Sequence, residues 1–371
     1  MASNISGIQS RLRQFRQRKD WSQEELAAKV DLRRQAIYDM ESGKYLPNTA
    51  VALRLAALFS CRVEDIFVPP SPVTIEPAVL PEWPLKEGAR LALSRIRGAL
   101  VGMALDQNTL RASDGSVSEA GDGPPLVQVF EPQDVLENNL FILGCDPALE
   151  LLGGHLRRYM PSAFPHIVFA SSKKALDSLA QGTAHAAAVH FHTDGDREGN
   201  LLEAEAALPG MPCRILAFSS KEEGLMVERG NLKGICSVAD LARPDVRFVN
   251  RESGAALRAL LQAKLAQNGI PENAVTGFTE HVHSHVEGAV RVLRNVADAA
   301  LGVRMVADTF GLDFVPLAVT RCDIVVPLDL EIYPAVAALL NALQSSHLRQ
   351  DLAALPGYDS GLTGNEIALI Q

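Results

Sequence analysis

The sequence predicts a multidomain protein with an all-α head followed by a larger α/β body. Three observations predict this class. Residues 5–68 show helical periodicity throughout, and residues 69–84 contain six prolines, which no helix or central strand accepts. From about residue 138, apolar strands such as NLFILG and HIVFA alternate with helices. That alternation favours a parallel sheet covered by helices on both faces.

The overall composition is that of a water-soluble globular chain. Of the 371 residues, 47% are hydrophobic and 21% are charged, and no apolar run approaches the roughly 18 residues that a membrane span needs. The N-terminal segment lacks the apolar stretch of a secretory signal. The five cysteines are scattered without a CxxC pair, which fits a reducing cytoplasm rather than a disulfide framework or a zinc knuckle.

The net charge of −9 is unevenly distributed. Residues 1–68 carry +3 and the remainder carries −12. A basic head on an acidic body confines the attraction for phosphate to the head.

The second helix of the head begins at a capping signal. Ser22 is expected to cap it and Glu25, three residues on, completes a capping box. A short turn over residues 30–32 leads to a helix in which Ile37 and Met40 are expected to be buried. This leaves the other residues of that helix on its outer side: Arg33, Arg34, Gln35, Tyr38 and Asp39. A later helix, opened by Pro47 and Asn48, is expected to bury Leu53, Ala56 and Phe59.

The run SQEELAAKV-x3-RQAIYDMESGKYLPN, followed by ALRLAALFSCRVEDIF, strongly resembles the Cro/repressor-type helix-turn-helix of the XRE family over about 60 residues. The resemblance implies a five-helix head with residues 33–41 as the recognition helix in the major groove of operator DNA. It implies base contacts from Arg34 and Gln35 and phosphate contacts from Gln23 and Lys44. The full expected DNA-binding set is Gln23, Arg33, Arg34, Gln35, Tyr38 and Lys44.

Two residues depart from the family pattern. Asp31 stands where the turn usually has glycine, and Arg33 replaces the usual hydroxyl cap of the recognition helix. The alternative for the head is a helical bundle that contacts protein rather than DNA.

Behind the head we expect a proline-rich, extended linker over residues 69–87 and a small β-rich connecting segment over residues 88–137. The α/β domain then occupies residues 138–371. A sheet of this kind binds ligands at the carboxyl ends of its strands, where helix N-termini converge.

Six segments of the body, GCDPALELL, AHAAAVHFHT, RFVNRESGAALRALL, SHVEGAVRVLRNVADAALG, LDFVPL and GYDSGLTGN, are similar in order to periplasmic-binding-protein-like domains. The relatives include molybdate-binding proteins. The resemblance implies a type II fold with two α/β lobes, a ligand cleft between them and an inserted lobe at about residues 222–317.

The strand-to-helix junctions favour a small anion over a cation. Ser171 and Ser172 offer hydroxyl and backbone N–H groups at one helix start, Arg251 precedes a second, and Ser284 begins a third. The expected ligand-binding residues are Cys145, Asp146, Ser171, Ser172, His190, Arg251, Gly254, Arg258, Ser284 and His285. The expected effector is an oxyanion such as molybdate or tungstate, with no cofactor.

Hydroxyl donors are missing at Cys145 and over residues 254–257, where relatives tend to have serine or a Gly-Ser-Gly-Thr-like run. A phosphorylated or carboxylated metabolite therefore stays open as the ligand.

Other readings compete with oxyanion sensing. The run His281, His283 and His285 would share one face of an extended segment and could bind zinc, copper or nickel. The binding domain could also serve only for dimerisation. We find no Walker loop, GxSxG or HExxH motif, so a DNA-tethered enzyme is not favoured. Together these observations predict a non-enzymatic, homodimeric, ligand-responsive DNA-binding regulator in the cytoplasm.

Overall fold

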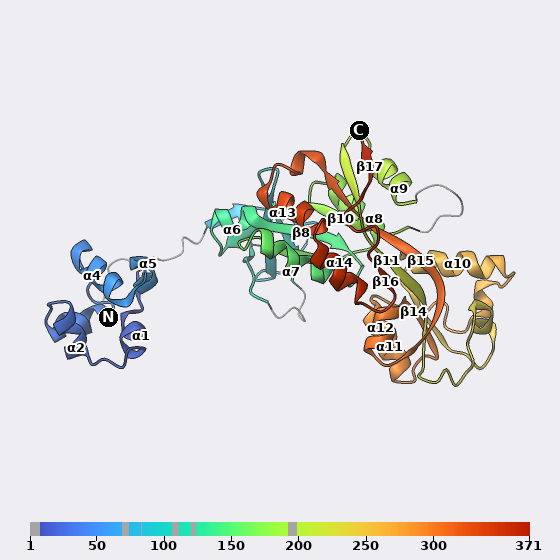
Figure 1. Cartoon of the computed structure of the whole chain (residues 1–371), viewed down its shortest axis with the longest axis horizontal. Coiled ribbons are helices and arrows are strands. Elements are labelled where there is room, and N and C mark those ends of the chain that lie inside the picture. The colour runs from blue at the N-terminus through green and yellow to red at the C-terminus, as the bar shows by residue number, and fades with distance from the viewer. Residues whose placement is uncertain (1–7, 69–73, 83, 106–110, 120–123, 192–198) are drawn as a thin grey trace. The chain divides into compact units, whose positions relative to one another are not determined.

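The computed structural model describes residues 8–68, 74–82, 84–105, 111–119, 124–191 and 199–371 (Figure 1). The chain divides into two compact units, Met1–Thr74 and Ile75–Gln371. In the described residues no helix is both long enough and apolar enough to cross a membrane.

The described residues of the first unit, 8–68 and Thr74, include five helices and one small ribbon. The helices are α1 (Leu12–Gln17), α2 (Gln23–Lys29), α3 (Arg34–Glu41), α4 (Thr49–Phe59) and α5 (Val63–Ile66). The ribbon pairs β1 (Gln9–Ser10) with β2 (Phe67–Val68) in antiparallel fashion, a feature that the sequence did not predict. The head is therefore helical, as expected, with its two ends tied together.

The local signals of the head act as expected. The Ser22 hydroxyl accepts from the Glu25 amide while the Glu25 carboxylate accepts from the Ser22 amide, so both halves of the capping box form. Asp31 has φ of +54°, the left-handed conformation that glycine supplies in relatives. Arg33 occupies the N-cap of α3 without a side-chain capping bond.

The expected core stripe of α4 is wrong at one position. Leu53 is 58% exposed. The buried residues of α4 are Val51, Ala52, Leu55, Ala56 and Phe59. Ala52, Leu55, Ala56 and Phe59 follow the i, i+3, i+4, i+7 spacing of one helix face, and Leu53 falls outside it.

The body begins with a five-stranded sheet in the order β3-β7-β6-β4-β5. Its strands are β3 (Thr74–Pro77), β4 (Arg90–Ile96), β5 (Ala99–Ala104), β6 (Gly115–Glu119) and β7 (Leu126–Val129). Just after β3, the Val79 amide donates to Leu100 and the Val79 carbonyl accepts from Gly102. These bonds join one edge of the sheet to the other, so we refer to residues 74–129 as the barrel.

The barrel corrects the expectation of an extended linker reaching residue 87. Residues 74–77 form a strand, and Ala78 and Leu80 are buried. Pro77 is tolerated because it ends a strand at the edge of the sheet, where one amide fewer breaks no ladder. Helix α6 (Gln133–Asn138) then leads into the two lobes.

The two lobes share a ten-stranded sheet in the order β13-β12-β14-β11-β15-β10-β8-β9, with β16 and β17 also paired to β11. The first lobe contains β8 (Asn139–Gly144), β9 (Phe164–Phe169) and β10 (Ala186–Val189). The second contains β12 (Phe248–Arg251), β13 (His281–Val282) and β14 (Ala299–Val303). Within each lobe these strands run parallel.

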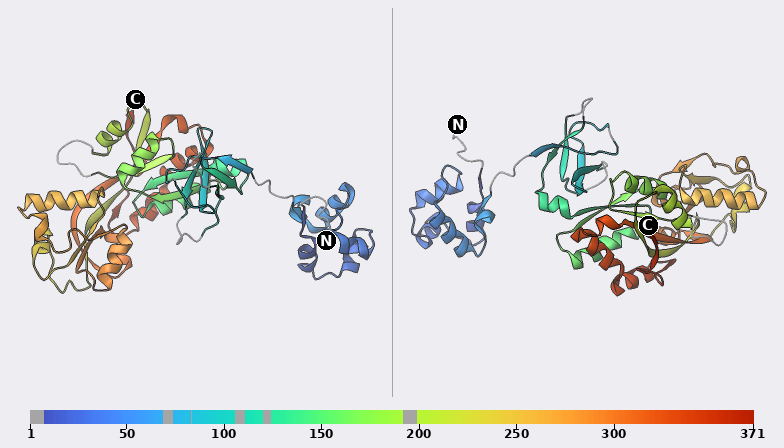
Figure 2. Two further views of the ribbon diagram at one scale, coloured as in Figure 1. Left: turned by 180° about the vertical axis from the view of Figure 1, so that it is seen from behind. Right: turned by 90° about the horizontal axis from the view of Figure 1, so that it is seen from above.

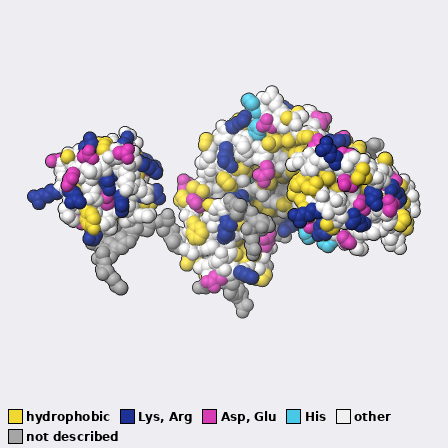
Figure 3. Space-filling view, turned by 90° about the horizontal axis from the view of Figure 1, so that it is seen from below, with side chains coloured by type: hydrophobic (Ala, Val, Ile, Leu, Met, Phe, Trp, Pro, Cys, Tyr) yellow, Lys and Arg dark blue, Asp and Glu magenta, His cyan; other side chains and the backbone are white. Residues whose placement is uncertain are grey.

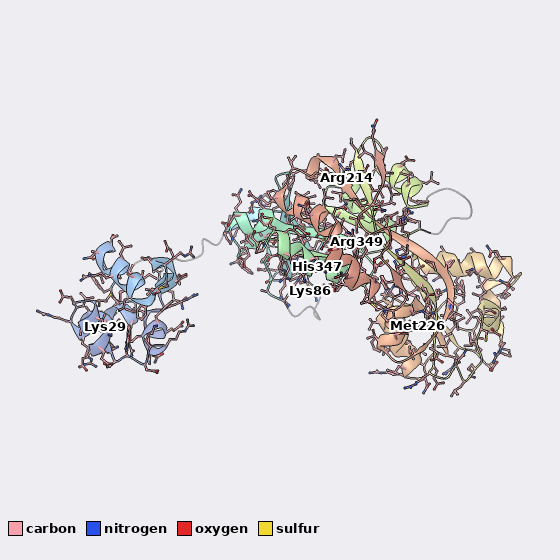
Figure 4. The ribbon with its side chains drawn as sticks, in the orientation of Figure 1. Lys29, Lys86, Arg214, Met226, His347 and Arg349 are labelled. Carbon is pink, nitrogen blue, oxygen red and sulfur yellow. The ribbon has the colours of Figure 1, made fainter. Side chains whose placement is uncertain are left out.

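Two strands of 15 residues connect the lobes: β11 (Cys213–Val227) and β15 (Asp313–Pro327). They pair antiparallel along their whole length, with register shifts after Ala217 and after Glu223. Figure 4 labels Arg214 and Met226 near the two ends of β11, one in each lobe. The sheet is therefore mixed, which corrects the expectation of a parallel sheet.

Helices cover both lobes. The first lobe has α7 (Leu149–Tyr159), α8 (Ser172–Ala180), α9 (Gly199–Ala207), α13 (Pro334–Leu343) and α14 (Ser346–Ala353). The second has α10 (Ala256–Gln267), α11 (His285–Leu293) and α12 (Arg304–Thr309). Short 3-10 turns lie at Val238–Ala242, Glu272–Ala274 and Leu328–Leu330. The strands β16 (Tyr358–Asp359) and β17 (Glu366–Ile370) end the chain against β11.

The cores follow this division. Residues Ala92, Ile96, Val101 and Met103 of the barrel share one apolar core with β8, α7 and α13 of the first lobe, and Figure 2 shows the barrel against that lobe. The second lobe has two cores, one beneath α10 and one beneath α11 and α12.

Candidate functional site

A cavity lies where the two lobes meet, and its empty space, including the solvent at its mouth, is about 270 Å³. The first lobe contributes Cys145, Ser171, Ser172 and His190. The second lobe contributes Arg251, Glu252, Ala255, Ala256, Leu257 and His285.

The secondary structure explains why these residues converge. Cys145 follows β8, His190 follows β10 and Arg251 ends β12, all at the carboxyl ends of strands. Ser172 begins α8 and His285 begins α11. Free backbone N–H groups at helix starts and the helix dipoles favour an anion here.

Arg251 supplies the positive charge of the cavity. Its side chain is only 3% exposed, and its Nε and Nη2 atoms donate to the Glu252 carboxylate at 3.1 and 3.0 Å. Nη2 also donates to the His283 carbonyl. The guanidinium carbon lies 5.9 Å from the ring centre of Phe169 in the first lobe, so Arg251 contacts both sides of the cleft.

His285 is the nearest neighbour of Arg251 in the cavity. Arg251 Nη1 lies 3.2 Å from His285 Nδ1, and a guanidinium can only donate, so this ring nitrogen accepts. Burial and the charge of Arg251 lower the pKa of His285 well below its usual value. The ring is therefore neutral at pH 7.

A chain of polar groups lies at the first-lobe wall. Cys145 Sγ is 3.7 Å from His190 Nδ1, and His190 Nε2 is 3.4 Å from Glu223, which also accepts from the Thr320 hydroxyl. Burial raises the pKa of Cys145 to about 12, so the sulfur is a neutral thiol. This order of contacts fits a thiol that donates to Nδ1 while Nε2–H faces the carboxylate.

The two serines contribute less than the sequence predicted. The Ser172 hydroxyl accepts from the His190 amide at 3.0 Å and donates to the His190 carbonyl at 3.2 Å, so it is fully used inside the lobe. The Ser171 hydroxyl accepts from the Lys174 amide and caps α8, which leaves its proton for a ligand.

Asp146 does not line the cavity, although the sequence placed it among the ligand-binding residues. It accepts from Lys221, Ser219 and Tyr358 at 3.0, 3.1 and 2.7 Å. Burial alone would raise the pKa of Asp146, but the Lys221 charge and the hydrogen bonds from Tyr358, the Ala148 amide and Lys221 lower it. Asp146 therefore anchors strand β11 beneath the site.

Three further expected residues support the cavity from outside it. Gly254 has φ of +90° in the turn before α10. Arg258 donates to the Arg251 carbonyl, and Ser284 caps α11 by accepting from the Glu287 amide. None of the three lines the cavity.

Sequence reasoning missed both the lining segment 255–257 with Glu252 and the buried layer of β11. Ser219, Lys221 and Glu223 alternate along β11 and are all buried. Residues 219–223 are polar at every position, so the sequence carried no sign of which of them the fold buries.

The histidine run does not form a metal site in the structure. His281 and His283 are exposed with their rings 5.3 Å apart, whereas His285 is buried beside Arg251. Across the described ranges no group of three or more His, Cys, Asp or Glu residues is placed to hold a metal ion. The metal-sensing alternative therefore has no geometric support there.

In the head, the outer side of α3 and the residues just after it are exposed. Arg33, Arg34, Gln35, Tyr38 and Lys44 all lie at the surface. Gln35 Nε2 donates to Asp39 at 3.0 Å, and Lys44 Nζ lies 5.4 Å from the Tyr38 ring centre.

Gln23 is placed differently from the other expected DNA contacts. Its side-chain Nε2 donates to the Glu41 carboxylate. Arg16 Nε lies 2.6 Å from the other oxygen of that carboxylate. These bonds join α1, α2 and α3.

A helix-turn-helix head, together with a two-lobed domain whose cleft is lined by polar side chains, defines a class of DNA-binding regulators that carry a ligand-binding domain. Residues 153–344 match the PBP superfamily domain and residues 12–66 match a helix-turn-helix family. The chain therefore belongs to the PBP superfamily and carries an XRE-type helix-turn-helix at its N-terminus. It is a DNA-binding helix-turn-helix regulator with a PBP-like domain.

Two relatives match the chain over stretches of different length. The chain is 30% identical over 249 residues to the uncharacterized protein YvgK of Bacillus subtilis (strain 168), covering 67% of this chain and 79% of YvgK. Over 61 residues it is 43% identical to an uncharacterized HTH-type transcriptional regulator of Archaeoglobus fulgidus, covering 16% of this chain and 87% of that one.

Among solved structures, a putative phosphate ABC transporter substrate-binding protein with bound phosphate, from Clostridium perfringens, aligns with a TM-score of 0.45. It is 13% identical, and the alignment covers 58% of this chain and 97% of that one.

Proposed function

We propose that the chain is a ligand-responsive transcription regulator in which the cleft senses a small oxyanion, such as molybdate or tungstate, and controls operator binding by the head. In this proposal residues 1–68 read DNA, residues 138–371 sense the ligand with an inserted lobe at about 222–317, and the protein acts as a cytoplasmic homodimer. The observation that carries the proposal is the buried guanidinium of Arg251 at a cavity lined from both lobes.

The physical argument concerns charge. Arg251 is paired with the Glu252 carboxylate, so an anion that binds this guanidinium must take the place of that carboxylate, while neutral His285 and neutral Cys145 offer no negative charge to a metal ion. Backbone N–H groups at the starts of α8, α10 and α11 add neutral donors. An anion held by both lobes stabilises the closed arrangement because it contacts both lobes only there.

A second candidate ligand is a small carboxylated or phosphorylated metabolite. Ala255, Ala256 and Leu257 line the cavity where an oxyanion site would use hydroxyl donors. These side chains favour a ligand with an apolar part beside its anionic group.

The test measures binding of labelled operator DNA by anisotropy with and without molybdate, tungstate, sulfate and phosphate. A bound effector must change operator affinity, and the operator must change effector affinity by the same factor. An anion at 100 times its dissociation constant should also add about 2.7 kcal/mol to the stability of the body.

The variant Arg251→Ala should lose anion binding at least tenfold, while Arg247→Ala should not. Arg247 is a matched control because it lies in the same lobe, exposed and paired with Asp298. If no oxyanion binds the wild type but a small organic acid does, the metabolite takes the place of the oxyanion. An anion that binds without changing operator affinity would remove the sensing role for that ligand.

A further inference from the structure

The barrel and the first lobe form one block. Asn139 at the start of β8 donates to the Leu93 carbonyl at 2.8 Å and its own carbonyl accepts from the Ser94 hydroxyl at 2.7 Å. Arg97 in the barrel pairs with Asp329 of the first lobe at 2.6 Å. The two parts also share one apolar core. The chain enters the body through this block, so closing the cleft moves the second lobe relative to it.

The outer face of α11 in the second lobe is apolar and uncovered. Val286 and Leu293 are 48% and 55% exposed, and Val290 between them is partly exposed. Their spacing of four and then three residues is that of a coiled-coil seam. We call Val286, Val290 and Leu293 the α11 stripe.

Further apolar surface continues the stripe beyond the end of the helix. Val296 is 48% exposed, and Leu232, 78% exposed, lines a shallow depression together with Asn295. In Figure 3 hydrophobic side chains gather on this part of the second lobe. Apolar side chains grouped in this way mark interaction surfaces.

The charges beside the stripe are self-complementary. Glu287 and Arg294 are seven residues apart, so they lie on the same edge of the stripe, one near each end of the helix, and Glu287 also pairs with Arg291 of its own helix at 3.7 Å. In a parallel pair of α11 helices each would face an apolar residue. In an antiparallel pair related by a twofold axis through Val290, Glu287 of each copy faces Arg294 of the other.

We propose that a second copy of this chain packs antiparallel on the α11 stripe. The proposal rests on the dimeric regulator described above and locates its contact. A twofold contact of this kind is isologous, as pairing of two operator-reading heads requires.

The same helix contacts the ligand cavity. His285, its first residue, lines the cavity, while the α11 stripe faces away from the core. Ligand and partner subunit thus act on different sides of one helix. A ligand that shifts α11 therefore changes the geometry of the two subunits relative to each other. The connection between the chain and the barrel does not have to change.

The test is sedimentation velocity of the full-length protein at micromolar concentration. Leu293→Glu and Arg294→Glu should each raise the dimer dissociation constant tenfold or more, and Glu287→Arg combined with Arg294→Glu should restore it. Ile332→Glu is the control, since Ile332 is exposed on the first lobe. Unchanged thermal unfolding shows that each variant folds.

Dimerisation of Leu293→Glu and Arg294→Glu at wild-type strength would overturn the α11 contact, while the dimeric regulator would stand with its contact elsewhere. A wild type that is monomeric both alone and on operator DNA would remove the homodimer itself. The operator titrations with anions remain an independent test of sensing.

Discussion

His185 couples the stability of the first lobe to pH. Its Nδ1 accepts from the Phe141 amide at 3.0 Å, and the residue is almost fully buried. Burial lowers the pKa of His185 to about 4. A proton on Nδ1 would break the bond to Phe141, whereas the unfolded chain takes up that proton near pH 6.5.

The sign follows from that difference in pKa. Since the unfolded state binds the proton first, this group lowers the free energy of unfolding as pH falls from about 6.5 to about 4. Between pH 7.5 and pH 5 the loss from His185 should be about 2 kcal/mol. Urea unfolding of wild type and His185→Gln at both pH values measures it. The variant should lose about that much less than wild type over the same interval, and equal losses would exclude His185 as the cause.

At the scale of elements, helix α3 begins at a charged residue that does not cap it. Arg33 has the extended backbone conformation of an N-cap but makes no capping bond. A serine there would accept from the backbone and stabilise the helix by about 1 kcal/mol. The arginine instead adds a charge at the helix expected to meet DNA.

Arg33→Ser should therefore make the head more stable and its DNA binding weaker. We expect about 1 kcal/mol more stability and a salt dependence of operator binding lower by about one ion. Thermal unfolding and anisotropy at several salt concentrations test both effects. Arg54→Ser, in the middle of α4, is a control that should bring no such gain in stability. An Arg33→Ser variant with the full salt dependence would show that Arg33 does not contact phosphate.

Elements with local signals were predictable, and elements stabilised by distant partners were not. Helices α2, α8 and α11 begin at the serines that cap them, because a cap needs only its own turn of helix. Strands β11 and β15 run on through Lys221 and Thr320, where the apolar pattern stops. Lys221 is buried because Asp146, which follows β8, binds it, and Thr320 is buried because Glu223 of the neighbouring strand accepts from it.

At the scale of the whole molecule, the sequence located the cleft better than it assigned roles within it. The junctions at Ser171, Arg251 and His285 do meet around one cavity, because strand ends and helix starts converge in this fold. Which side chains face the cavity depends on packing between lobes. Asp146 and Ser172 form hydrogen bonds with residues that only the folded chain brings near them. The apolar segment 255–257 forms part of the cavity lining.

The barrel also determines at which residue a stable fragment of the body can begin. Strand β3 holds one edge of the sheet, Leu80 is buried in the barrel core, and Glu76 pairs with Arg95 at 2.7 Å. A fragment of residues 85–371 loses all three and leaves β7 with an unpaired edge, whereas residues 74–371 keep them. Loss of a buried leucine alone costs about 2–5 kcal/mol.

We therefore expect the 74–371 fragment to unfold at the temperature of the body in the full-length protein. The 85–371 fragment should unfold about 5 °C lower or more, and should aggregate through the freed strand edge. Calorimetry and light scattering of both fragments measure this. A matched change within the longer fragment, Leu80→Ala, separates packing from the edge, because it removes the buried side chain and leaves β3 paired. Equal unfolding temperatures for the two fragments would mean that residues 74–84 add nothing to the stability of the body.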